Sequence, residues 1–272
     1  EYCGVLAGGG YPFQADNAAH NRMKTVLLVV LCGLIAPGLA PYDPARSVGL
    51  PWQAPDALFW CGTDALGRDV LSRTLHGGVA MLLFSLMATV AASLAGLVTG
   101  LVLLVLPDRG YQLTALLDSI LMLPPLLIVM MTYYALGPSP LTLLFAIMLL
   151  SAPFTARFIR ALAEPMLDSD YVMVARAAGD STGLLLRREI LPGVYPALLG
   201  DGATRLAGAF YLFSAASFLG INAVGQGNDW ASMVRESLEG MVLNPCALLL
   251  PAVSIASVMM LINRAVDRRG HG

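Results

Sequence analysis

Long apolar runs constrain this chain more than any other sequence feature. The stretch from Val79 to Leu106 contains no charged residue, and a helix needs about 20 apolar residues to cross about 30 Å of hydrocarbon. Across the chain 57% of the residues are hydrophobic and 12% are charged, whereas soluble domains have about 25% charged residues. The sequence therefore predicts a helical protein embedded in a membrane.

Six stretches are candidates for transmembrane helices, and the predicted fold class is an all-α membrane protein with six spans. They run near Thr25–Ala40, Val79–Leu106, Leu113–Leu136, Leu141–Phe158, Val194–Phe218 and Pro245–Val266. Residues 1–22 are polar and glycine-rich, and Met23 resembles a natural start. We therefore expect a tag or a disordered extension at 1–22 and one membrane domain over 23–272.

The distribution of basic residues predicts the orientation. If the N-terminus is cytoplasmic, most arginines and lysines fall on the cytoplasmic side, as the positive-inside rule requires. The prediction is a multi-pass protein with both termini inside. The net charge of −2 argues against a nucleic-acid binder, which would be strongly basic.

The segment Pro41–Gly78 is expected outside the cell. Thr63 or Asp64 can cap a helix, and Asp64 and Arg68 stand four residues apart, so they can pair. Together with an apolar stripe over 70–75, this pattern predicts a short interfacial helix that leads into the second span.

A polar, glycine-broken segment, residues 168–193, separates the fourth and fifth spans. A hydroxyl or acidic residue among 168–170 can cap a first short helix, Gly179 can end it in a left-handed conformation, and Asp180 or Ser181 can cap a second. Composition leaves two interpretations open. The segment is either an amphipathic hairpin on lipid headgroups or a rigid knob presented to a cytoplasmic protein.

The spacing of Ala175, Gly179 and Leu191–Pro192 resembles the "EAA" loop of permease subunits of bacterial ABC importers. Three positions depart from that pattern: Met173 stands where the family has a glutamate, Val174 where it has its first alanine, and Glu189 where it has an isoleucine. The turn geometry is retained, but the charge contact of that glutamate is lost.

Two further motifs narrow the resemblance. "GTDALGRDVLSR" at Gly62–Arg73 is similar to the outer motif of the C-type subunits of dipeptide, oligopeptide and nickel permeases. "SFLGI", which ends at Ile221 and is followed by Trp230, resembles a second motif of that group. Trp230 also suits the membrane interface, because it joins an apolar ring to a polar N–H. The resemblance covers about Pro41 to Arg269.

The resemblance implies a permease domain that pairs with a homologous second permease, two ATPase subunits and an extracytoplasmic substrate-binding protein in the lipid of a bacterial inner membrane. Segment 168–193 would be the coupling loop that docks on an ATPase. The docking residues that it implies are Val172, Ala175, Arg176, Ala178, Gly179, Asp180, Leu184 and Leu185. ATP and Mg²⁺ would bind the ATPase chains, since this chain has no GxxxxGK[ST] phosphate loop and is expected to be neither an enzyme nor a cofactor binder.

Ionisable residues inside the expected spans are candidates for the substrate path. Asp201 and Arg205 lie four residues apart in the fifth span, and such groups cost about 2.5–3.5 kcal/mol each on insertion scales. They either line a hydrated path or form a neutral packing pair, unless the helix begins after them. Asp118 is a weaker path candidate, with a capping role as the alternative. Gly96 and Gly100 form a GxxxG pattern, which either serves close helix packing or occurs by chance in a glycine-rich membrane chain.

The sequence does not define the substrate. The resemblance allows short peptides and nickel or other metal chelates, with a slight preference for a chelate because the second outer loop is short. The spacing of the cysteines favours free thiols at Cys61 and Cys246 over a zinc site or a disulfide. The alternative function is a non-transport membrane scaffold whose basic loop binds lipid or another protein.

Overall fold

The computed structural model describes residues 31, 33–105, 115, 119, 121–221 and 228–267. Residues 1–22, the part of the expected span Thr25–Ala40 that covers 25–30 and 32, and Asp118 lie outside the described residues. Within these ranges all regular elements are helices, and no strand forms apart from two isolated bridges in loop 40–69.

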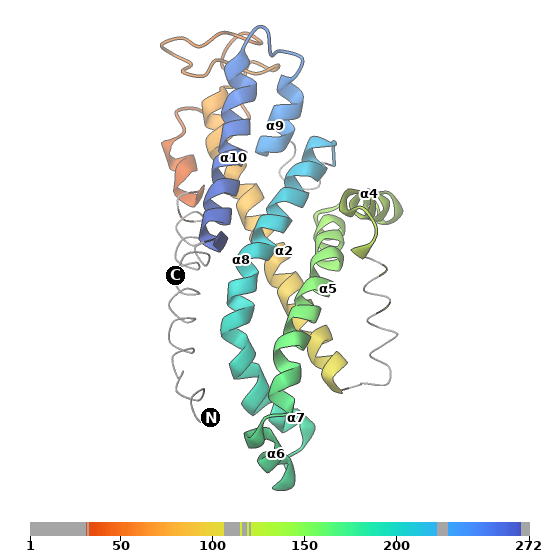
Figure 1. Cartoon of the computed structure of the whole chain (residues 1–272). Coiled ribbons are helices and arrows are strands. Elements are labelled where there is room, and N and C mark those ends of the chain that lie inside the picture. The colour runs from red at the N-terminus through yellow and green to blue at the C-terminus, as the bar shows by residue number, and fades with distance from the viewer. Residues whose placement is uncertain are drawn as a thin grey trace, which may run out of the picture.

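The long helices pack side by side as a bundle, and the shorter elements lie at its two ends (Figure 1). Loop 40–69 and α9 lie at one end, and α6 and α7 at the other, as the prediction of opposite membrane sides requires. The elements are the 3-10 helix η1 (Ala36–Leu39), α2 (Val70–Val105), α4 (Pro125–Leu136), α5 (Pro140–Leu167), α6 (Asp170–Ala177), α7 (Thr182–Leu185), the π-helix η2 (Leu186–Ile190), α8 (Leu191–Phe218), α9 (Trp230–Ser237) and α10 (Pro245–Asp267).

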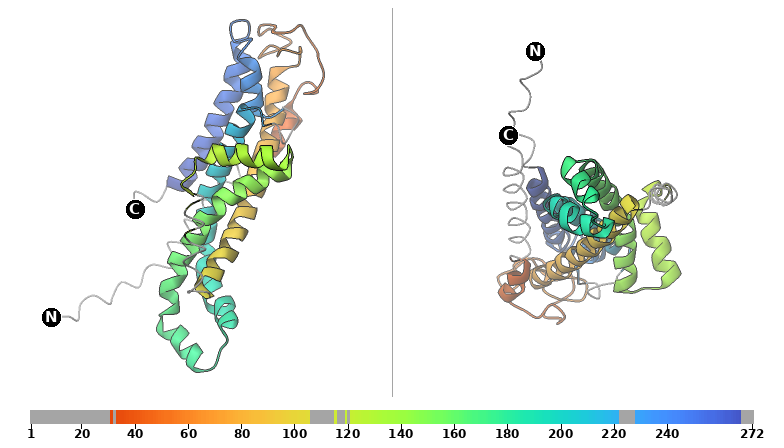
Figure 2. Two further views of the ribbon diagram at one scale, coloured as in Figure 1. Left: turned by 90° about the vertical axis from the view of Figure 1, so that its right-hand side faces the viewer. Right: turned by 90° about the horizontal axis from the view of Figure 1, so that it is seen from below.

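Three described helices are long and apolar enough to cross a membrane: α2, α5 and residues Pro245–Arg264 of α10. Helix α8 has 28 residues but carries Asp201 and Arg205. Helix α4 has 12 residues, which is about 18 Å, and it lies across the bundle in Figure 2. The count of six spans is therefore not confirmed by the described residues.

The expected span Leu113–Leu136 is not one continuous helix in its described part. Pro124 is extended (φ −56°, ψ 126°), and α4 begins at Pro125. Proline lacks the N–H that continues a helix, and the residue before a proline is driven out of the helical region. The two prolines therefore redirect the chain rather than bend a single span.

The expected interfacial helix is also a wrong prediction: in segment 40–69 the structure has turns and no helix. Asp64 caps a turn, accepting hydrogen bonds from the backbone N–H of Leu66 (2.8 Å) and Arg68 (2.9 Å). Gly67 has φ +71°, which breaks the helical path. Asp69 then accepts from the N–H of Ser72 at 2.8 Å, so α2 starts at Val70 and the apolar stripe belongs to its first turns.

Helix α2 packs closely against α5. A Cβ atom at Gly96 would lie 2.5 Å from Cβ of Thr155, and one at Gly100 would lie 2.9 Å from the carbonyl oxygen of Ala156. Both distances are below ordinary van der Waals contact. The GxxxG pattern therefore does bring two helices together, as predicted from the sequence.

Trp230 is not an interfacial anchor, because the structure buries it between α9 and α2 with 8% of the residue exposed. Its indole N–H donates to the carbonyl oxygen of Thr74 at 2.5 Å. Gly77 and Gly78 leave the room that the indole occupies. The polar N–H that suited an interface is satisfied inside the protein, and α9 is thereby fixed to the start of α2.

Apolar side chains form two separate cores. The larger joins α2, α4, α5, α8, α9 and α10 and includes the rings of Phe84 and Phe213, which are tilted by 49° with their centroids 5.1 Å apart. The smaller lies at the other end and holds segment 168–193 against α5 and α8. Its buried residues are Ile159, Ala163, Val172, Leu185, Ile190 and Val194.

Candidate functional site

Asp201 and Arg205 form the ion pair that the sequence predicts, near the middle of α8. The Arg205 Nε donates to Asp201 Oδ2 at 3.0 Å, and its Nη2 donates to Oδ1 at 3.0 Å. Thr155 on α5 donates its hydroxyl to Oδ2 at 3.2 Å. The Asp201 side chain is 8% exposed and that of Arg205 is 19% exposed. A two-point pair of this kind is the strong form of an arginine–carboxylate contact.

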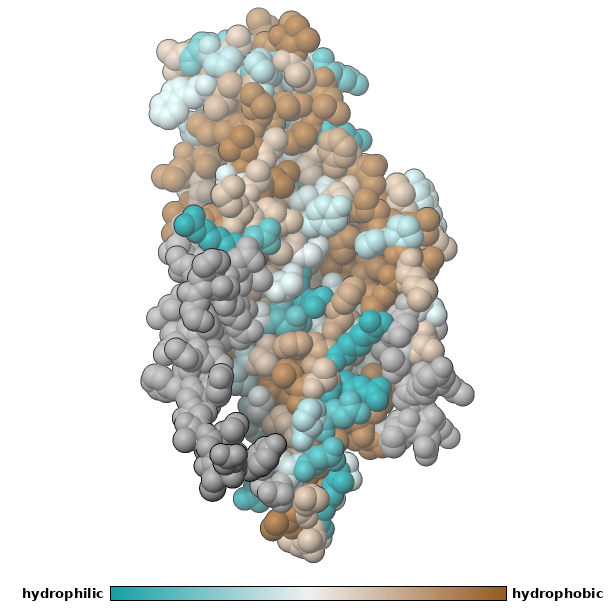
Figure 3. All heavy atoms as spheres, viewed as in Figure 1, coloured by the Kyte–Doolittle hydropathy of each residue, from teal (hydrophilic) through white to brown (hydrophobic). Residues whose placement is uncertain are grey.

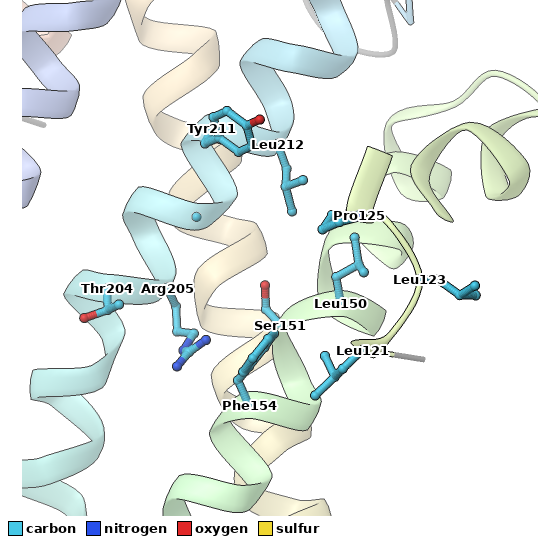
Figure 4. Close-up of a pocket in the computed structure, with 11 residues that line it drawn as sticks. Leu121, Leu123, Pro125, Leu150, Ser151, Phe154, Thr204, Arg205, Tyr211 and Leu212 are labelled. Carbon is cyan, nitrogen blue, oxygen red and sulfur yellow. The ribbon is translucent and has the colours of Figure 1, made fainter. Parts of the chain in front are cut away.

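Arg205 lines a groove of about 210 Å³ between α8, α5 and the start of α4 (Figure 4). Its guanidinium carbon lies 5.1 Å from the centroid of the Phe154 ring. In Figure 4 the Ser151 hydroxyl and the Arg205 side chain flank the same space. The groove therefore places one cation and a few hydroxyl groups among apolar walls.

A second groove lies on another side of α8, against α2. It measures about 370 Å³, and its lining, which includes Val90, Leu94, Leu198 and Leu206, has no charged residue among those described. The two faces of α8 thus differ in chemistry: one carries the ion pair, and the other is suited to lipid or to another apolar helix.

The sequence prediction for segment 168–193 is confirmed in its order of helix, glycine turn and helix, but the expected side-chain caps are wrong, since Ser169 and Ser181 precede the two helices without a capping hydrogen bond. Helix α6 ends at Ala177, Gly179 has φ +95°, and α7 begins at Thr182 with Ser181 before it. A Cβ at Gly179 would meet no atom within 4 Å, so glycine is required there by the backbone conformation rather than by a close neighbour. After α7 the chain passes through η2 into α8 without a break.

The proposed docking residues divide by exposure. Val172 is 0% exposed and Leu185 is 2% exposed, so both are interior residues of the smaller core and have no surface for a partner. This corrects their assignment as direct contacts, since both side chains face inward. The remaining residues reach the surface in full or in part: Ala175, Arg176, Ala178, Gly179, Asp180 and Leu184.

On the face shown in Figure 3, hydrophilic residues gather in the half toward α6 and α7, and hydrophobic surface dominates the opposite half. Two exposed apolar side chains, Met173 (53%) and Val174 (68%), flank the proposed docking residues. The tip of the segment thus combines apolar side chains with Arg176, which suits contact with a protein.

Sequence reasoning missed a four-charge ring at the other end of the bundle. Asp64 pairs with Arg68 at 2.7 Å and with Arg73 at 2.5 Å. Glu236 on α9 pairs with Arg73 at 3.2 Å and with Arg68 at 3.6 Å. The Arg73 side chain is 1% exposed. Only the Asp64–Arg68 pair could be predicted from spacing, because Glu236 lies far away in the sequence.

The sequence of the chain matches one known family of membrane proteins. The family described as the inner membrane component of binding-protein-dependent transport systems matches residues 92–270. The chain belongs to this family. The matched region contains α5, the segment 168–193 and α8, and therefore both the ion pair and the proposed docking residues.

Individual permeases of this family resemble the chain over most of its length. The di/tripeptide transport system permease protein DppC of Pseudomonas aeruginosa is 31% identical over 92% of this chain and 86% of its own length. The peptide transport system permease protein SapC of Escherichia coli is 32% identical over 77% of this chain and 71% of its own length. SapC of Haemophilus influenzae is 29% identical over 92% of this chain and 87% of its own. The resemblance to ABC importer permeases is confirmed.

Among the described residues the permease holds two free thiols, Cys61 and Cys246, as the sequence predicts, and both lie at the end of the bundle that carries loop 40–69. Partial burial raises the pKa of the Cys61 thiol, and the neighbouring Cys246 and Asp69 raise it further. The side chain of Asn244 donates to the carbonyl oxygen of Cys61 at 3.0 Å and so ties the outer loop to the start of α10. Among the described residues, no group of three or more His, Cys, Asp or Glu side chains could hold a metal ion.

Proposed function

We propose that this chain is the permease subunit of an ATP-driven importer of short peptides and forms half of the translocation path with a homologous second permease. The relatives named above are permeases of peptide transport systems. This supports a peptide over a nickel or other metal chelate and reverses the slight preference drawn from the length of the outer loop.

The buried ion pair carries the assignment of the path. Asp201 and Arg205 sit near the middle of α8, where the cost of charge in hydrocarbon is highest, and Arg205 opens to a groove rather than to the apolar face of the helix. A pair kept only for packing would have no need to open to a cavity. The groove side of α8 faces the substrate, and the apolar side faces lipid or a neighbouring helix.

The segment 168–193 couples the path to ATP hydrolysis on partner chains. Its tip docks on an ATPase subunit through Ala175, Arg176, Ala178, Gly179 and the residues beside them. Val172 and Leu185 hold the tip against α5 and α8 from within. Because α7, η2 and α8 are continuous, a displacement of the tip reaches the helix that carries Asp201. ATP and Mg²⁺ bind the ATPase chains, and an extracytoplasmic protein delivers the substrate.

Reconstitution tests this function. The chain is expressed with its genomic neighbours, the ATPase subunits that copurify are identified, and the complex is placed in liposomes that contain ATP and Mg²⁺. Uptake of a labelled dipeptide that depends on ATP and on the binding protein is the expected result. A chain that recruits no ATPase yet binds anionic vesicles would instead be the lipid-binding scaffold.

The orientation can be tested by thiol labelling in a cysteine-free background. Ser181→Cys, in the docking segment, is expected to react with an impermeant reagent only from the cytoplasmic side. Ala57→Cys, in the outer loop, is expected to react only from outside. Both residues are exposed in the structure. Labelling of both from one side would contradict the proposed topology, with both termini inside.

A further inference from the structure

Arg205 has hydrogen-bonding capacity that its ion pair does not use. Its Nε and Nη2 donate to Asp201, whereas its Nη1 makes no hydrogen bond to any residue that the structure describes. A guanidinium has five N–H donors in a fixed fork, so the side of the fork away from Asp201 remains available. Because Arg205 lines the groove, these unused N–H donors are available to a ligand there.

The surroundings of this donor favour an anion. Arg205 is the one charged residue among the described residues that line the groove. Ser151 from α5 offers a hydroxyl to the same space (Figure 4), and Phe154 supports the flat face of the guanidinium. Most of the other walls are apolar, including Leu150 and Leu212, and a low local dielectric strengthens a hydrogen bond between charged groups.

We infer that this groove is a carboxylate subsite in the substrate path. The Arg205 Nη1 and the Ser151 hydroxyl donate hydrogen bonds to the carboxylate of a short peptide as it passes. The inference rests on the proposed function, because it assigns a carboxylate-bearing peptide to the same path. It adds the recognised group and the atoms that recognise it.

Asp201 has a second task in this arrangement. It holds the guanidinium by two hydrogen bonds and is itself held by Thr155, so the fork points at the groove in one orientation. Its negative charge also offsets that of Arg205, and the carboxylate of the substrate meets a weaker positive field than that of a lone arginine. Transport requires binding that is favourable enough to admit the substrate and weak enough to release it.

The first experiment compares the transport of a dipeptide that has a free carboxylate with transport of its C-terminal amide. Uptake is measured in the reconstituted complex with the binding protein saturated by each peptide. Arg205→Gln is expected to lower the acid-to-amide ratio about tenfold relative to the native chain, the usual worth of a charge-assisted hydrogen bond. The contribution of the binding protein cancels, because it is the same in both complexes.

Two variants sharpen this comparison. Arg160 also belongs to an i,i+4 ion pair, with Glu164, but it lies outside the groove. Arg160→Gln is therefore expected to leave the acid-to-amide ratio unchanged. Asp201→Asn is expected to slow release and so to lower both the half-saturating concentration and the maximal rate for the acid. An amidated peptide with an aspartate side chain shows whether the subsite takes any carboxylate or only the C-terminal one.

The second measurement reads the charge of the groove without any substrate. Ser151→Cys in a cysteine-free complex is treated with thiosulfonate reagents that carry either a sulfonate or a trimethylammonium group. The anionic reagent is expected to react faster, Arg205→Gln to abolish that preference, and Arg205→Lys to retain it. Equal rates for the two reagents in the Ser151→Cys complex that retains Arg205 would overturn the subsite.

The outcomes separate the two proposals. If both peptides enter and the acid-to-amide ratio is the same with Arg205→Gln, the carboxylate subsite is wrong and the peptide permease stands. If neither peptide enters while the anionic reagent is still preferred, the groove is an anion site and the peptide assignment is wrong.

Discussion

The close approach of α2 to α5 predicts that Gly96→Ala destabilises the protein and disturbs the ion pair on α8. The added Cβ would lie 2.5 Å from Cβ of Thr155 and 2.7 Å from the carbonyl oxygen of Ala152, so the helices must move apart by about 1 Å to reach normal contact. Overpacking of this kind costs about 1–3 kcal/mol. The higher helix propensity of alanine returns about 1 kcal/mol, which leaves a net loss of up to about 2 kcal/mol.

The assay is the temperature at which half of the detergent-solubilised complex remains monodisperse. At about 2–4 °C per kcal/mol for a chain of about this size, a drop of up to about 8 °C is expected. Gly202→Ala is the matched control, since a Cβ there would meet no atom within 4 Å. A midpoint for Gly96→Ala that equals or exceeds that of Gly202→Ala would refute the packing argument.

A second control separates stability from the site. Gly100→Ala meets the Ala156 carbonyl oxygen and Ile159, so it should destabilise the same interface. Gly96→Ala alone displaces Thr155, which donates to Asp201. Peptide uptake per folded complex should therefore fall with Gly96→Ala and hold with Gly100→Ala. Equal losses in both variants would mean that Thr155 does not transmit the change.

Three further variants test other parts of the structure. Gly179→Val forces a residue with a side chain to adopt φ +95°, which costs about 1–3 kcal/mol, so ATPase copurification should weaken about tenfold. Gly183→Val, in an open helical position, is the control and should retain copurification. Asp64→Asn leaves the buried Arg73 without its closest charge and should cost about 3 kcal/mol of stability. The double variant with Arg73→Gln should therefore lose less in thermal midpoint than the sum of the two single losses. Additive losses would contradict the four-charge ring. The raised pKa of Cys61 keeps its thiol protonated near neutral pH, so its alkylation at pH 8 should be slower than that of glutathione and should still be rising above pH 9.

Features that depend on nearby residues could be predicted from the sequence. The turn between the two short helices follows from Gly179, which tolerates φ above zero, although the side-chain caps expected before each helix do not form. The Asp201–Arg205 pair follows from spacing alone, because residues four apart share one face of a helix. The close packing at Gly96 and Gly100 required no knowledge of which helix would be the neighbour.

Features that depend on the meeting of distant segments could not be predicted. Nothing local to Arg73 identifies Glu236 as its partner, and nothing local to Trp230 indicates that Gly77 and Gly78 make room for it. The apolar stripe over 70–75 has the same period in a surface helix as in the first turns of a longer helix, which is why the interfacial helix was predicted. The groove beside Arg205 exists only where α4, α5 and α8 meet.

The π-helix η2 determines how far the proposed docking tip is rotated about the helix axis relative to the ion pair on α8. A π turn holds about one residue more than an α turn, and one residue of an α-helix corresponds to about 100° around its axis. The faces of α7 are therefore offset by about that angle from where an unbroken helix would place them relative to Asp201. Removing one residue from Leu186–Ile190 would restore an α-helical register and turn the tip about the axis of α8, with little change in its height along the bundle.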